Sequence, residues 1–227
     1  MKSFSNALIF FFLLSNSCLF AQIKFSAATD VSILHNFDPQ QKFTVIGQTV
    51  LPQWHFDKKN TVYAWITYHA NGKYENTLIA TAKSPTTQPQ TISFTNQSVM
   101  RLRQISFGFK RYLVGSFENL EKFNVYAAGG FGVMYGNASN IFSTNIDTAL
   151  YTIQYNVIHG SGDFKRLTFD ITGGVEFPIS YEIYIYSEMR MYIPTTDYPS
   201  KYLLNNSHAP FLCGINFGLR ILFDTDP

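Results

Sequence analysis

The residue types that most often do chemistry in proteins are few in this sequence and widely separated. Five histidines stand at positions 35, 55, 69, 159 and 208, and none has the HExxH spacing of a zinc-protease helix. The two cysteines, Cys18 and Cys213, form no CxxC motif. The run Gly129-Gly130-Phe131-Gly132 lacks the helix and the Lys-Ser/Thr that follow a nucleotide loop, so it favours close packing within a strand. The sequence therefore predicts no metal site, no cofactor and no catalytic residue.

Charged side chains, by contrast, recur on one face of segments whose other face is apolar. Arg220, for example, lies opposite Leu219 and Ile221. A charge turned into a protein interior must be paired, because an isolated one is costly. We therefore predict an interior polar network that consists of Asp30, Lys110, Arg166, Asp170, Glu176, Glu188, Arg190 and Arg220. A catalytic set drawn from the Asp170/Glu176 carboxylates and the Glu188/Arg190 pair is the alternative, although structural ion pairs are the commoner explanation.

The elements that must position these charges are β-strands. Hydrophobic residues make up 46% of the 227 residues and charged residues only 14%, a composition that disfavours disorder. Apolar residues alternate with a period of two, most clearly at the C-terminal end of the sequence. Eight strands are predicted, over residues 23–34, 43–56, 61–69, 100–113, 123–136, 164–177, 182–193 and 211–223.

The connections between these strands alternate in length. Those at 57–60, 114–122 and 178–181 are short, whereas those at 70–99, 137–163 and 194–210 are long and polar. Short turns at one end and long loops at the other are typical of a transmembrane barrel. We therefore predict an all-β fold, a single eight-stranded antiparallel up-and-down transmembrane β-barrel over residues 22–227, with both termini in the periplasm.

A soluble lipocalin-like carrier of an apolar ligand also has eight strands. The two folds differ in the direction of the apolar face of the strands, which points outward to lipid in a transmembrane barrel. The carrier would turn its apolar face inward. Here the other face is mostly Gly, Ala, Ser, Thr and Asn, which suits a narrow barrel interior better than a water-facing surface. We expect the apolar face to point outward, bounded by an interfacial girdle of aromatic residues: Trp54, Phe56, Tyr63, Tyr112, Phe123, Tyr181 and Phe223.

The N-terminus is typical of an export signal. Lys2 is followed by the apolar run 7–14, which is too short to span a bilayer, and by small residues up to Ala21. We predict Sec export with cleavage after Ala21, so that residues 1–21 are a signal peptide. The alternative is lipidation at Cys18, which lacks the usual Leu three positions upstream.

The last strand carries a recognisable motif. Asn216, Gly218, Ile221 and Phe223 match the C-terminal assembly signal of bacterial outer-membrane proteins, although the chain continues through residues 224–227. With the signal peptide and the strand layout, the chain resembles the small eight-stranded outer-membrane barrels of Gram-negative bacteria, of the OmpA and OmpX type. The resemblance implies a place in the outer membrane, among its lipids, and insertion by the outer-membrane assembly machinery. It does not imply one function.

The long loops hold the remaining candidates for function, because binding residues concentrate in loops. Tyr198, Lys201 and Tyr202 suit recognition of an extracellular protein or glycan. A non-enzymatic anchoring or binding role at the cell envelope is therefore expected. The alternative is a lipid-modifying enzyme similar to the outer-membrane deacylases, for which His159 and Ser161 are the candidates. A net charge of +2 argues against nucleic-acid binding.

Overall fold

The computed structural model describes residues 24–197, 199–207 and 209–223. The predicted signal peptide at 1–21, its cleavage site and the alternative lipidation site at Cys18 lie outside the described residues, as does Tyr198. The described residues form ten β-segments and one short 3-10 turn, η1 (Gln154–Asn156). The β-segments are β1 (Lys24–Asn36), β2 (Phe43–His55), β3 (Asn60–His69), β4 (Gly72–Ala82), β5 (Thr91–Val114), β6 (Asn124–Phe142), β7 (Tyr151–Ile153), β8 (Gly160–Pro178), β9 (Ile183–Pro194) and β10 (Leu212–Phe223).

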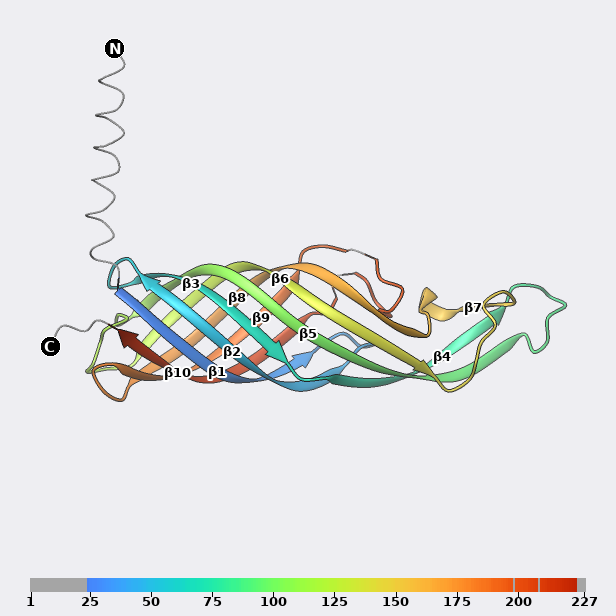
Figure 1. Ribbon diagram of the computed structural model, residues 1–227, viewed down its shortest axis with the longest axis horizontal. Coiled ribbons are helices and arrows are strands. Elements are labelled where there is room, and N and C mark those ends of the chain that lie inside the picture. Colours follow the sequence, from blue (N-terminus) through green and yellow to red (C-terminus); the bar gives the residue numbers. More distant parts are fainter. Residues whose placement is uncertain (1–23, 198, 208, 224–227) are drawn as a thin grey trace, which may run out of the picture.

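Eight of these segments close into a barrel (Figure 1). The hydrogen-bonded order is β3-β2-β1-β10-β9-β8-β6-β5, and the β3–β5 pairing completes the ring. Every pairing is antiparallel, and β1 meets β10 over a register that runs from Phe25↔Phe223 to Asn36↔Leu212. The predicted up-and-down barrel of eight strands is confirmed. The described chain begins and ends at the same end of the barrel, called here the terminal end, and the opposite end is the distal end.

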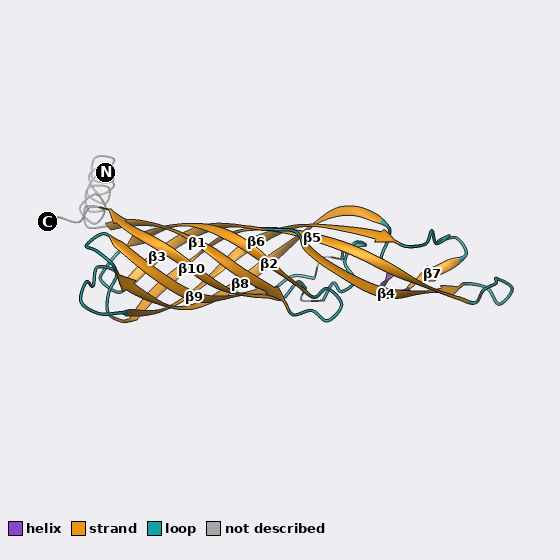
Figure 2. Ribbon diagram, turned by 90° about the horizontal axis from the view of Figure 1, so that it is seen from below, coloured by secondary structure: helices purple, strands orange, loops and turns teal. Residues whose placement is uncertain are grey.

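Beyond the distal end, part of the wall continues as a sheet (Figure 2). β3 pairs with Arg103–Arg111 of β5, and β4 pairs with Thr91–Met100 of the same strand. β3 and β4 therefore pair with consecutive parts of β5 and are separated only by residues 70–71. β7 adds a short strand beside β4. The prediction of a loop over 70–99 is wrong for β4 and for the start of β5, because the exposed face of β4 is largely polar and so lacks the apolar alternation on which the prediction relied.

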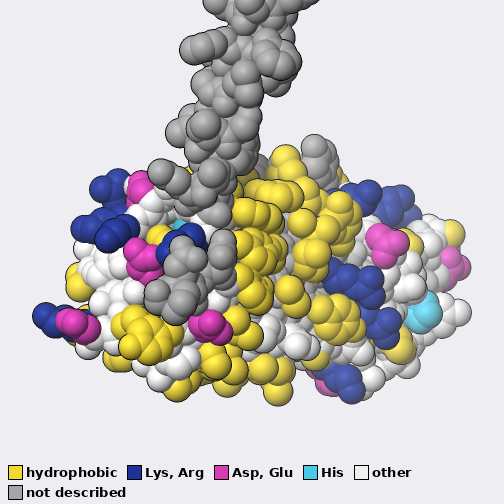
Figure 3. Space-filling model, turned by 60° about the vertical axis from the view of Figure 1, so that its left-hand side comes forward, with side chains coloured by type: hydrophobic (Ala, Val, Ile, Leu, Met, Phe, Trp, Pro, Cys, Tyr) yellow, Lys and Arg dark blue, Asp and Glu magenta, His cyan; other side chains and the backbone are white. Residues whose placement is uncertain are grey.

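The apolar faces of the barrel strands point outward. Phe131 is 68% exposed and Phe107 is 65% exposed, whereas Trp65 and Arg220 are fully buried in the lumen. On the face shown in Figure 3, hydrophobic side chains form a band between charged side chains at the two ends. The outward face predicted from the sequence is confirmed, and the inward apolar face that a lipocalin-like carrier requires is contradicted.

An aromatic girdle marks the terminal end of the barrel. The Phe25 ring lies 5.6 Å from that of Phe223 and 5.8 Å from that of Trp54. Of the predicted girdle, Trp54, Phe56, Phe123, Tyr181 and Phe223 are exposed. Tyr63 and Tyr112 are buried in the lumen instead, because each points inward from its strand while its neighbours in sequence point outward.

Within the described part of the chain, no helix is both long and apolar enough to cross a membrane.

Candidate functional site

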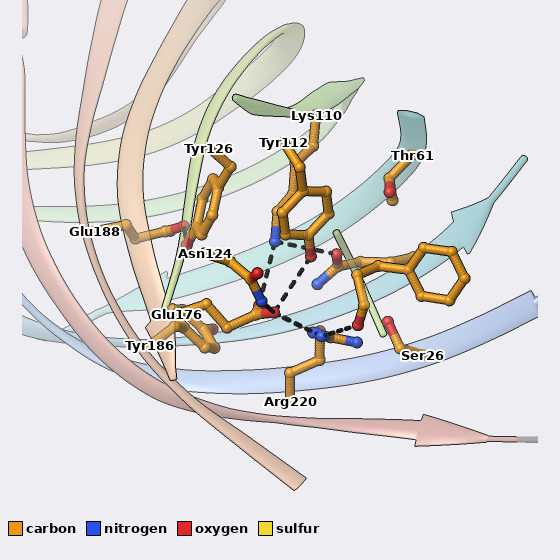
Figure 4. Close-up of polar contacts among 12 residues, drawn as sticks. Ser26, Thr61, Lys110, Tyr112, Asn124, Tyr126, Glu176, Tyr186, Glu188 and Arg220 are labelled. Atoms are coloured by element: carbon orange, nitrogen blue, oxygen red, sulfur yellow. Dashed lines mark hydrogen bonds and ion pairs between the residues drawn. The ribbon is translucent and has the colours of Figure 1, made fainter. Parts of the chain in front are cut away.

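The lumen near the terminal end holds a buried ion cluster centred on Glu176 of β8 (Figure 4). Arg220 of β10 donates from Nε to Oε2 at 2.9 Å and from Nη2 to Oε1 at 2.6 Å. The Lys110 Nζ of β5 lies 3.5 Å from Oε2. The Tyr112 hydroxyl and the Asn124 amide each donate to Oε1 at 3.4 Å. One carboxylate thus balances two cations that come from two other strands.

A second cluster lies further along the lumen, around Arg190 of β9. Arg190 pairs with Glu188 on its own strand, and its Nη2 lies 3.5 Å from Asp30 Oδ2 on β1. The Tyr186 hydroxyl donates to Asp30 Oδ2 at 3.0 Å, and the Tyr126 hydroxyl donates to Glu188 Oε2 at 2.9 Å. Every one of these side chains is buried, and their contacts join β1, β6 and β9, which are not neighbours in the barrel wall.

The two remaining members of the predicted network lie outside these clusters. Asp170 accepts a hydrogen bond from the Gln104 amide at 2.8 Å. Arg166 lies in the distal half of β8, where its Nε donates to the Ala209 carbonyl at 3.1 Å and its Nη2 donates to Asn206 Oδ1 at 3.3 Å. Arg166 therefore ties the 195–211 connection to the barrel wall instead of joining the carboxylates of the lumen.

Tyrosines complete both clusters, and the predicted network omits them. Tyr112 contacts Glu176, Tyr126 contacts Glu188, and Tyr186 contacts Asp30. A signal for two of them is present in the sequence, because Tyr112 and Tyr186 each stand two positions from a charged member of the network and so share its face.

Side chains fill the lumen. The guanidinium of Arg190 lies 4.7 Å from the centroid of the Trp65 ring, and Arg220 lies 3.9 Å from that of Tyr184. The void that remains beside Trp65 and Arg190 has a volume of about 20 Å³, room for about one water molecule. Apart from this void, packed side chains occupy the lumen beside Trp65 and Arg190.

Described residues of the connection between β9 and β10 bond to β6 and to the connection before β8 at the distal end. The Tyr202 carbonyl accepts from the Asn140 amide at 2.9 Å, and the Lys201 carbonyl accepts from the Ile158 N–H at 2.9 Å. Lys201 and Tyr202 line an open groove of about 710 Å³ together with Phe164 and Pro199. Both described loop candidates thus lie on one groove, and Tyr202 also packs against Gly162 of β8.

The core of the extension is continuous with that of the barrel lumen, since one cluster of buried residues contains Leu78 and Phe94 together with Trp65. Leu78 of β4 and Phe94 of β5 are buried beneath Ile153 of β7 and Val157, which belong to the 143–159 connection. Tyr74 is buried in the same core, and burial raises the pKa of its hydroxyl to about 12. The connection is therefore packed on the sheet.

The tip of the extension, residues 83–90, is held by side-chain hydrogen bonds. The Gln90 amide donates to the carbonyls of Ser84, Pro85 and Thr87, at distances between 2.5 and 3.3 Å. The Lys83 Nζ donates to the Thr148 carbonyl at 2.7 Å, which links the tip to the connection packed beside it. The extension and its tip thus form one ordered unit.

The residues of the predicted assembly signal divide between the two faces of β10. The Asn216 amide donates to Asp30 Oδ1 at 3.2 Å within the lumen. A Cβ at Gly218 would meet the Tyr186 ring and a backbone carbonyl of β1, so the wall has no room for a side chain there. Ile221 and Phe223 are exposed on the outward face. The motif therefore coincides with a strand that closes the barrel.

The enzyme candidates lie at the start of β8. The His159 ring contacts the Phe142 ring at 5.7 Å, and Ser161 lies on β8 opposite Ser139. The 160–163 segment, predicted as part of a loop, is strand. The described residues contain no group of three or more His, Cys, Asp or Glu side chains placed to hold a metal ion.

Solved structures with the same arrangement are small outer-membrane barrels. Neisserial surface protein A (NspA) aligns over 87% of this chain and 96% of its own, with a TM-score of 0.52 and 8% identity. The N-terminal β-barrel domain of Pseudomonas aeruginosa OprF aligns over 89% and 100%, with a TM-score of 0.44 and 7% identity. Ail of Yersinia pestis aligns over 88% and 97%, with a TM-score of 0.45 and 10% identity.

At 8% identity the likeness to NspA shows the fold alone, which is that of the small eight-stranded outer-membrane barrels. No protein-family model and no curated protein sequence matches the chain.

Proposed function

We propose that this protein is a non-enzymatic outer-membrane barrel that holds a rigid β-sheet extension outside the cell and binds an extracellular protein or glycan there. The observation that carries the proposal is the continuous pairing of β4 with β5 beyond the barrel, over buried residues that continue the core of the lumen. An outward apolar band supports a membrane position, and a filled lumen leaves the distal surface as the place for function.

The experiment tests the location and the orientation of the extension. Thr86→Cys at the exposed tip and Lys58→Cys in the turn between β2 and β3 are introduced separately into a Cys213→Ser background. Intact Gram-negative cells are treated with a membrane-impermeant maleimide. Labelling of the tip variant alone, in an outer-membrane fraction that migrates faster on gels before boiling, is expected. Labelling of the turn variant alone, or recovery of a soluble protein, would contradict the proposal.

The enzyme alternative makes a different prediction. A deacylase-like activity would change the mass of envelope lipids extracted from cells that express the chain, and Ser161→Ala would abolish the change. We expect the lipid masses of expressing and non-expressing cells to be identical.

A further inference from the structure

An alternating row of aromatic and basic residues crosses four neighbouring strands on the outer wall. Tyr68 of β3 lies directly opposite Arg103 of β5, Arg103 opposite Tyr135 of β6, and Tyr135 opposite Lys165 of β8. All four side chains are exposed and lie on the outward face, which also carries the apolar band. The row is therefore a feature of the wall itself.

The aromatic rings hold the cations against the wall. The Arg103 guanidinium lies 5.4 Å from the centroid of the Tyr68 ring, and the Lys165 Nζ lies 5.6 Å from that of the Tyr135 ring. A cation above a ring at this distance is attracted to its face while its polar hydrogens stay available. The two pairs thus restrict the cations without neutralising them.

The row marks the distal limit of the apolar band. On each of the four strands, the outward residue two positions nearer the terminal end is aliphatic: Ile66, Ile105, Val133 and Leu167. Long basic and aromatic side chains at the edge of an apolar band are suited to the level of lipid headgroups, since one part of each is apolar and the other is polar. A lipid whose acyl chains covered the aliphatic row would bring its headgroup to Arg103 and Lys165.

A groove of about 430 Å³ lies beside the two cations. Arg101, Arg103 and Lys165 line it, and Asp163 is the carboxylate among its lining residues. Asp163 Oδ1 accepts a hydrogen bond from the Asn137 amide at 2.8 Å. With three cations and one carboxylate, the lining of the groove carries a net positive charge. An arginine guanidinium can form two parallel hydrogen bonds with the oxygens of one phosphate.

We propose that this groove binds the phosphate of a lipid headgroup, with Arg101, Arg103 and Lys165 as its cationic contacts. The acyl chains of the lipid would contact the aliphatic residues that lie two positions nearer the terminal end. The proposal rests on the outer-membrane location proposed above. It commits to a lipid phosphate because the groove opens on the same wall as the apolar band.

The test uses the full mature chain, refolded in phosphatidylcholine nanodiscs, with phosphatidic acid as the anionic probe. Retention of each lipid is read by native mass spectrometry after transfer to detergent. The test variant is Arg101→Gln/Arg103→Gln/Lys165→Gln. The control, Lys58→Gln/Lys59→Gln/Lys122→Gln, removes the same charge from exposed turns at the terminal end.

Wild type and control are expected to retain phosphatidic acid over phosphatidylcholine, and the test variant to retain it about 100-fold less, at about fivefold for each cation lost. Equal retention by the test variant would overturn the proposal. Displacement of the lipid by inorganic phosphate at equal concentration would also overturn it, in favour of a free-phosphate site.

Because this assay starts from a folded barrel in a nanodisc, its failure is separate from a failure of the location test. Surface labelling of the tip without selective lipid retention would refute the groove assignment alone.

Discussion

Removing the charge of Glu176 should destabilise the barrel more than any comparable change at its surface. In the Glu176→Gln variant, Arg220 and Lys110 lose the carboxylate that lies within ion-pair distance of both. Arg220 makes two charge-assisted hydrogen bonds with this carboxylate, at 2.6 and 2.9 Å, and each such bond contributes about 1.5–3 kcal/mol. The sum is about 3–6 kcal/mol, which brackets the range of about 3–5 kcal/mol for breaking a buried ion pair by removing one partner.

A glutamine of similar shape keeps one acceptor oxygen, so the lower part of that range applies, about 3 kcal/mol of the free energy of unfolding. The assay is reversible denaturant unfolding from lipid vesicles, followed by the fluorescence of Trp54 and Trp65. These tryptophans lie on the outward face and in the lumen respectively, and so report on both environments.

The matched control is Glu121→Gln in the turn between β5 and β6. It makes the same chemical change at an exposed site and should alter stability by less than about 0.5 kcal/mol. A second variant tests the electrostatic cause: adding Lys110→Met to Glu176→Gln removes one of the two uncompensated cations and should recover part of the loss. Equal stability of Glu176→Gln and its control would refute the reasoning.

Two further predictions concern the outer wall and the last strand. Phe107→Lys places a cation in the outward apolar band and should lower stability in vesicles by about 2–4 kcal/mol. A lysine in place of the exposed tip residue Thr86 should have little effect, as measured by denaturant unfolding. Phe223→Ala should reduce the heat-modifiable form that accumulates in cells, because it removes the aromatic residue of the assembly motif and its stacking on Phe25; unchanged accumulation would show that the assembly machinery does not read this residue.

Much of the barrel could be predicted from the sequence because a membrane imposes a strict pattern. An outward face in contact with lipid must be apolar at every second position, and Phe217, Leu219 and Ile221 of β10 follow that rule. Outside the membrane the rule lapses. β4 carries Lys73, Glu75 and Thr77 on its exposed or half-exposed face, so a strand there has the composition of a loop.

The partners within the lumen could not be predicted in the same way. Alternation indicates that Lys110, Glu176 and Arg220 point inward, but which of them meet depends on the tilt and stagger of the strands. Tyr112 illustrates a different error. Its position near a strand end suggested the girdle, although its spacing of two from Lys110 places it inside. The alternation of inward and outward side chains, continued from Lys110 to Tyr112, predicts the position of Tyr112 correctly.

The length of β5 also determines how far the extension reaches beyond the distal end of the barrel. The ten residues Thr91–Met100 pair with β4 beyond the barrel, and at about 3.4 Å per residue they add about 34 Å along the strand. If the extension keeps the tilt of about 40° that is typical of such barrels, its tip at 83–90 would stand about 25 Å beyond the distal end. The extension is therefore a spacer. In the proposed orientation, a molecule at its base would meet lipid headgroups, whereas a molecule at its tip would meet whatever lies beyond the headgroup layer. The two ends of one strand would then sample separate layers of the cell surface.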